Sequence, residues 1–99
     1  MAPEAGMEIS LQQGFRAGTD VVVRELEGEM VLLNLASGTY FGLDRVGTRV
    51  WQLVEEQATL DRVLAVMREE FDAPADVLER DVLQLVSQLA AQGLVVARE

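Results

Sequence analysis

The side chains that most often carry out chemistry are scarce in this sequence. Its 99 residues include no histidine and no cysteine, which removes the commonest general base and metal ligand, the thiolate nucleophile and any disulfide. The hydroxyls of Ser10, Ser37 and Ser87 have no histidine to activate them, and Tyr40 alone would not make an enzyme. We therefore expect a protein that is not an enzyme, with no catalytic residues, no cofactor and no metal site.

Paired acidic residues are the remaining candidates for acid–base or metal chemistry. Glu55-Glu56 and Glu69-Glu70 fall near the expected ends of two helices, beside polar neighbours and without a glycine-rich phosphate loop. Such pairs are more often solvated surface. The formal charge of −9, from 17 acidic and 8 basic residues, would repel a phosphate backbone, so we expect no nucleic-acid partner.

Length and hydropathy indicate one small domain. Apolar residues make up 49% of the chain, enough for a single core. No apolar run is long enough to cross a bilayer, and the first ten residues have neither the basic nor the apolar segment of a secretion signal. We expect a soluble, cytoplasmic protein with no membrane partner.

The segment 20–43 has the pattern of a three-stranded antiparallel meander. Residues 20–26 and 29–35 are rich in β-branched and apolar residues and are separated by a tight turn at Glu27-Gly28. After a second turn at 36–38, residues 39–43 form a third strand, which we expect at a sheet edge. Residues 1–19 look like a loosely ordered arm, with one short strand around Ile9 and Leu11.

Three helices follow. Asp44 is a good N-cap for a helix to about Val54, in which we expect Trp51 to be structural. Thr59 begins a second helix, and the third has Pro74 in its first turn and ends near Gln92. A core stripe of the second helix comprises Leu60, Val63, Leu64, Met67 and Phe71. The prediction is an α+β fold of winged-helix-like architecture: a three-stranded antiparallel sheet followed by three helices.

The third helix has more apolar surface than a single packed face requires. At about 100° per residue, its expected core stripe is formed by Leu78, Val82, Leu85 and Leu89. The apolar arc continues sideways through Val86, Ala90 and Leu83. Either the rest of the domain covers this flank or a binding partner does.

Gly42 lies inside the third predicted strand, where glycine is unfavourable. Such a glycine marks either a bulge, here before Asp44, or a place where another backbone approaches closely. An exposed edge strand can accept a peptide as an additional strand, with a neighbouring helix supplying pockets for alternate side chains. Both interpretations remain open at this point.

Three stretches resemble one known family. "MVLLNLASGTYFGLDRVGTRVWQLVE", "TLDRVLAVMREEFDAPADVLERDV" and "LAAQGLV" are similar to PqqD-like proteins, the RiPP precursor peptide recognition elements. The resemblance covers about residues 20–96 and predicts a recognition domain over residues 20–97. It implies a winged-helix domain that binds the leader segment of a ribosomally made precursor peptide, as a strand added between the third strand and the third helix.

The resemblance also implies site residues and partners. The strand side of the groove would comprise Thr39, Tyr40, Phe41, Gly42 and Leu43. Candidates on the helix side are Glu79, Asp81, Val82, Leu83, Val86 and Ala90. The sequence of residues 35–51 looks most like the corresponding stretch of the stand-alone recognition proteins of lasso-peptide pathways. Expected partners there are the precursor leader peptide, a leader peptidase of the cysteine-protease type and an ATP-dependent cyclase.

Two other functions fit parts of this sequence. A winged-helix DNA-binding regulator would place the third helix in the major groove, but that helix carries only Arg80 as a cation and several acidic residues. A small subunit that stabilises an enzyme without touching its substrate is the other alternative. The leading hypothesis remains a non-catalytic adaptor that binds a leader peptide.

Overall fold

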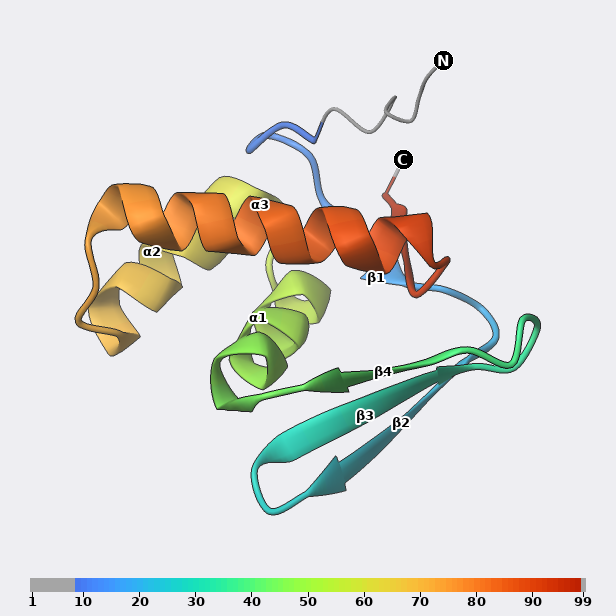
Figure 1. Ribbon diagram of the computed structural model, residues 1–99. Helices are drawn as coiled ribbons and strands as arrows, with labels where there is room; N and C mark the ends of the chain where they lie inside the picture. The colour runs from blue at the N-terminus through green and yellow to red at the C-terminus, as the bar shows by residue number, and fades with distance from the viewer. Residues whose placement is uncertain (1–8, 99) are drawn as a thin grey trace.

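The computed structural model describes residues 9–98. Its elements, in chain order, are β1 (Phe15–Ala17), β2 (Val21–Leu26), β3 (Glu29–Asn34), β4 (Tyr40–Leu43), α1 (Arg45–Glu56), α2 (Leu60–Glu70), α3 (Ala75–Ala91) and β5 (Val95–Ala97). The α+β architecture of a three-stranded antiparallel sheet followed by three helices is confirmed (Figure 1).

The main sheet has the order β2-β3-β4, so β4 is an edge strand as predicted. Both pairings are antiparallel. The β2–β3 turn places Glu27 at φ 55° and Gly28 at φ 85°, the left-handed conformation that tight hairpin turns demand and that glycine adopts without strain. This turn fixes the register of β2 against β3.

The helices begin and end where their flanking residues predict. The Asp44 carboxylate accepts a hydrogen bond from the Gly47 N–H at 2.8 Å and caps α1. Pro74, predicted in the first turn of α3, instead occupies the N-cap position directly before it. Beyond α3, Gly93 has φ 71°, and the Leu94 N–H bonds back to the Leu89 carbonyl at 2.9 Å, which terminates the helix.

The core lies between α1, the sheet, α2 and α3, and α3 packs against α2, which it crosses in front in the view of Figure 1. Trp51 is 2% exposed, and four residues of the predicted α2 stripe are buried. The fifth, Phe71, is half-buried because it is the residue that follows the last turn of α2. The apolar periodicity therefore identified the packed face of α2.

The N-terminal segment differs from the expected loose arm. No strand forms at Ile9 and Leu11 in the described chain; instead the Leu11 carbonyl accepts a hydrogen bond from the Asp61 N–H at 2.9 Å, at the start of α2. Phe15, in β1, is buried, and β1 pairs antiparallel with β5. Residues 9–17 are thus packed against the domain. The predicted arm's residues 1–8 lie outside the described residues.

The C-terminal end is fastened by Arg98. Its guanidinium donates to the Phe15 carbonyl at 2.9 Å, and to the carbonyls of Glu55 and Val54 at 2.9 and 3.4 Å. Carbonyls in the last turn of a helix lack intrahelical partners. Arg98 therefore joins β1, β5 and the end of α1 at one point.

Candidate functional site

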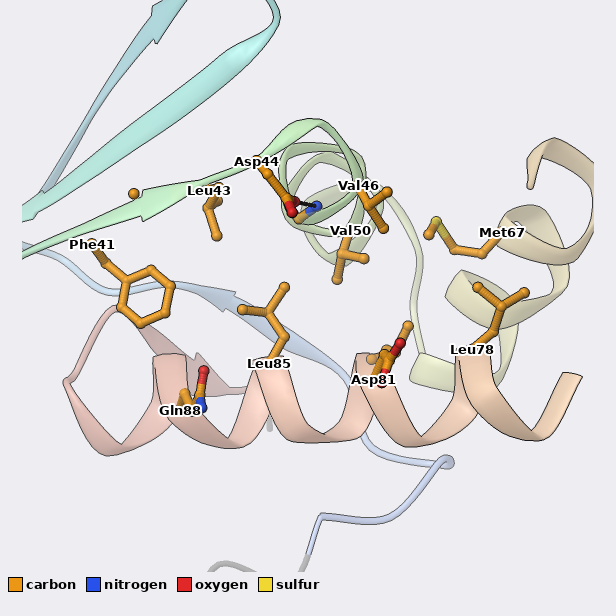
Figure 2. A pocket seen from close by; sticks show the side chains of 13 residues that line it. Phe41, Leu43, Asp44, Val46, Val50, Met67, Leu78, Asp81, Leu85 and Gln88 are labelled. Carbon is orange, nitrogen blue, oxygen red and sulfur yellow. Dashed lines mark hydrogen bonds between the residues drawn. The ribbon is translucent and has the colours of Figure 1, made fainter. Parts of the chain in front are cut away.

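A groove of about 510 Å³ runs between β4 and α3. Its floor is formed by α1, with Met67 of α2 at one end (Figure 2). The lining residues are Phe41, Gly42, Leu43, Asp44, Val46, Gly47, Val50, Met67, Leu78, Asp81, Val82, Leu85 and Gln88. From here on "the groove" means the space that these residues enclose.

The connection between β4 and α1 sets one wall of the groove. Leu43 is buried, and Asp44 directly after it caps α1. A Cβ atom on Gly47 would lie 3.2 Å from Leu43 Cδ2 and 3.3 Å from Asp44 Oδ1, which is tighter than ordinary packing. Glycine at this position therefore lets the first turn of α1 sit close beneath β4.

The groove combines an apolar interior with acidic groups. Phe41 and Leu85 point into it from opposite sides (Figure 2). The charged residues of its lining are Asp44 and Asp81. The side chain of Asp81 is 60% exposed, and its Oδ1 lies 3.7 Å from Nε of Arg80. Such a surface suits apolar side chains accompanied by a cation.

The outer edge of β4 offers backbone hydrogen-bonding groups. The Asn34 N–H donates to the Thr39 carbonyl at 2.9 Å, and hydrogen-bonded pairs alternate with non-hydrogen-bonded pairs along an antiparallel ladder. Counting from that pair, Phe41 bonds to β3, whereas Tyr40 and Gly42 turn their N–H and C=O towards the free edge. This edge borders the groove.

The bulge interpretation of Gly42 is wrong. The β3–β4 register runs without interruption, with Val31 opposite Gly42 and Leu32 opposite Phe41. A bulge would place two residues of one strand against one of the other. Gly42 therefore pairs like any other residue of the strand. The presence of a glycine at this position needs another explanation.

On the strand side, the structure brings most of the predicted site residues together. Phe41, Gly42 and Leu43 line the groove. Tyr40 starts β4 and is 75% exposed. Thr39 lies in the preceding turn, where its hydroxyl is 2.7 Å from that of Ser37.

On the helix side, the predicted residues divide between two flanks of α3. Asp81 and Val82 line the groove, and Val82 is buried. Val86 is fully buried in the core, because its side of α3 faces the rest of the domain. Glu79, Leu83 and Ala90 are half-buried on that same side and do not belong to the lining. The predicted apolar flank is thus packed within the protein.

Sequence reasoning missed three of the residues that α3 contributes to the groove lining, which are Leu78, Leu85 and Gln88. Leu85, expected in the core, is half-buried and lines the groove together with Gln88. With Asp81, these residues recur at helical spacing and mix apolar with polar side chains. A mixed stripe beside a fully apolar one is the signal that could have identified the exposed wall.

Two other kinds of site find no basis in the described residues. Within residues 9–98, no three side chains of the types that bind metals come together. Among the helices of that range, none is long and apolar enough to cross a membrane.

Comparison with known proteins identifies the family of this chain. Residues 29–95 match the family of coenzyme PQQ synthesis protein D (PqqD). The chain belongs to the PqqD family. A PqqA binding protein from Rhizobium meliloti (strain 1021) is 29% identical over 86 residues, covering 87% of this chain and 82% of the relative. The PqqD-like recognition element predicted from the sequence is confirmed.

Two solved structures have the same fold as this chain. TbiB1 in complex with the TbiA(beta) leader peptide is 35% identical, with a TM-score of 0.75, covering 81% of this chain and 93% of that one. A lasso peptide synthetase B1 complexed with the leader peptide is 26% identical, also with a TM-score of 0.75, covering 83% and 96%. The DNA-binding alternative gains no support from these comparisons.

Proposed function

We propose that this protein binds the leader segment of a ribosomally synthesised precursor peptide as a strand added to β4. The observation that carries the proposal is the free edge of β4 beside an apolar groove. Backbone groups of Tyr40 and Gly42 supply the ladder for an incoming strand. Both solved relatives were determined with a leader peptide bound.

Alternate side chains of the bound strand have different surroundings. Because strand side chains point in turn to opposite faces, every second residue of the leader enters the groove between Phe41 and Leu85. Apolar contact there supplies most of the affinity, and Asp81 favours a neighbouring cation. We assign the helix side of the site to Asp81, Val82, Leu85 and Gln88, within the recognition domain of residues 20–97.

The role we assign is that of a non-catalytic cytoplasmic adaptor. Having bound the leader, the protein presents the precursor to a leader peptidase of the cysteine-protease type and to an ATP-dependent cyclase. A lasso-peptide pathway is the context we favour, because one of the similar structures is a lasso peptide synthetase B1. Sequence resemblance and this likeness support the assignment.

Amide hydrogen exchange tests the proposed binding mode. The probe is a panel of synthetic leader peptides, of which the TbiA(beta) leader is the first, with scrambled versions as controls. Binding should slow exchange at Tyr40 and Gly42, whose amides face the free edge of β4. Val23 and Glu25 face the opposite edge of the sheet, on β2, and should be unaffected. Saturable binding with unchanged exchange in β4 would contradict the proposal.

A further inference from the structure

Neither the backbone conformation at position 42 nor packing among the described residues requires a glycine there. The φ of Gly42 is outside the positive range in which Gly28 and Gly93 lie. A Cβ atom at Gly42 would have no heavy atom of the described residues within 4 Å, apart from its chain neighbours. The open space contrasts with Gly47, where a Cβ would press on Leu43. A β-branched residue would form a better strand at Gly42.

The open space lies on the solvent face of the sheet, opposite to the groove side. Tyr40 and Gly42 alternate with Phe41 and Leu43, and the latter two face the core and the groove. Val31, which pairs with Gly42, is 36% exposed, and Tyr40 is 75% exposed. Gly42 thus leaves open space on this face, beside the exposed side chains of Tyr40 and Val31.

We infer that the bound peptide lays a large aromatic side chain across Gly42, against Tyr40 and Val31. The inference rests on the proposed addition of a strand to β4. Side chains of directly paired residues project from the same face of a sheet, so the peptide residue opposite Gly42 projects to the solvent face. A glycine without Cβ lets a flat ring cover the backbone, a cross-strand arrangement that stabilises glycine in edge strands.

An aromatic ring is the side chain that this open space beside Tyr40 and Val31 favours. A ring over Gly42 buries apolar surface on Val31 and can pack edge-to-face or offset with Tyr40. A small side chain would leave Tyr40 and Val31 as exposed as they are now. Recognition would then use both faces of the added strand: apolar residues in the groove and one aromatic residue on the outside.

Substitution of Gly42 separates this role from a structural one. Gly42→Val should fold with unchanged or higher stability in urea, because the site has room and valine favours strands. Its Cβ methyl groups would occupy the place of the ring. Val22→Phe, which adds bulk on the same face at the opposite edge strand, is the matched control and should leave peptide affinity unchanged.

The binding test uses peptides selected from a random display library against the full chain. A selected peptide and its variant with the aromatic residue replaced by alanine are measured against both proteins. Gly42→Val should weaken the aromatic peptide by about tenfold and the alanine peptide far less. The Gly42 Hα protons should shift upfield only with the aromatic peptide, since they lie under its ring.

The outcomes distinguish the inference from the function on which it rests. If no selected peptide binds, or none slows exchange in β4, the proposed function fails and the inference with it. If peptides bind along β4 but share no aromatic position, or if Gly42→Val weakens both peptides equally, the inference alone is overturned.

Discussion

Trp51 is the largest side chain of the core and stands 2% exposed on α1. We predict that Trp51→Ala lowers the free energy of unfolding by about 3–5 kcal/mol, because it removes buried apolar area and leaves a cavity. Urea denaturation followed by circular dichroism measures this. Tyr40→Ala, at 75% exposure, should change it by no more than about 0.5 kcal/mol. A stable Trp51→Ala variant that had lost peptide binding would instead assign the ring to recognition.

Asn34 at the end of β3 holds two parts of the fold together. Its Nδ2 donates to the Gln92 carbonyl at 3.0 Å, and its Oδ1 accepts from the N–H groups of Ala36 and Ser37 at 3.0 and 3.4 Å. The side chain thereby ties the β3–β4 turn to the end of α3. The turn leads into β4, and β4 and α3 form two sides of the groove, so Asn34 links these two sides near one end.

We predict that Asn34→Ala costs about 1–3 kcal/mol of unfolding free energy, because partly buried backbone groups lose their partners. The midpoint and slope of urea unfolding give the value. Ser37→Ala, in the same turn but exposed, is the control and should be close to neutral. If Asn34→Ala lowered the free energy of unfolding by as little as Ser37→Ala is expected to, the Asn34 hydrogen bonds would contribute nothing measurable to stability.

Between elements, one ion pair joins α1 to the end of α2. The Arg49 guanidinium donates two hydrogen bonds of 2.7 Å to the two carboxylate oxygens of Glu70. These bonds hold the pKa of Glu70 below its ordinary value of 4.5. A lowered carboxyl pKa contributes stability that is present above the ordinary value and is lost as pH falls through the lowered one.

We therefore predict that Glu70→Gln lowers stability near neutral pH, and that the difference from the wild type disappears as the pH falls below about 4.5. The effect should be small and should weaken with salt, since the pair is partly exposed. Urea midpoints across a pH series measure it. Glu69→Gln removes the same charge from the neighbouring position and should not reproduce the pH dependence; if it does, the pair is not responsible.

The two flanks of α3 should differ in function. Leu85 lines the groove, whereas Leu83 is half-buried on the opposite flank. We predict that Leu85→Ala speeds dissociation of a bound peptide by about tenfold, because it removes apolar contact that forms after docking. Leu83→Ala, the same truncation, should reduce stability and leave dissociation unchanged. Stopped-flow displacement measures the dissociation rate for each variant. Faster dissociation from Leu83→Ala, with an unchanged rate for Leu85→Ala, would place the binding site on the flank of Leu83.

Most elements could be predicted from the sequence because their signals are local. Asp44 predicts the start of α1, and Gly93 predicts the end of α3. Apolar periodicity predicts the buried stripe of α2. The pairing of β1 with β5 could not be predicted, since it joins Phe15 to Ala97 across the whole chain and each strand has three residues. Long-range pairing of such short strands leaves no local pattern.

For the groove lining, the sequence predicted Phe41, Gly42 and Leu43 on the strand side, and Asp81 and Val82 on the helix side. Alternation along residues 40–43 determines which side chains point towards α3. On a helix, periodicity gives the width of the apolar arc but not which flank meets a neighbour. Val86 and Leu85 lie on either side of the core stripe, and only the tertiary packing shows that Val86 is covered and Leu85 open.

Across the whole molecule, the charge of −9 creates a field that acts before any contact forms. Such a field repels polyanions and attracts cationic peptides, increasing the rate of encounter. Asp44 and Asp81 concentrate negative charge at the groove itself. The attraction due to the charge of the whole protein and the attraction due to the groove can be separated. The same charge reversal is made once at the groove and once at a distant position, and the association rates are compared.

We predict that Asp81→Lys slows association of a lysine-containing peptide and flattens its dependence on salt, while dissociation changes little. Exposed charges act over a Debye length of about 8 Å at physiological ionic strength, so only those near the groove should matter strongly there. Glu69→Lys on α2 changes the total charge by the same amount at a position outside the groove lining, and should slow association much less. Stopped-flow association over a range of salt concentrations measures both variants. Equal slowing by the two would show that the overall charge of the protein, rather than the acidic groove, guides the peptide.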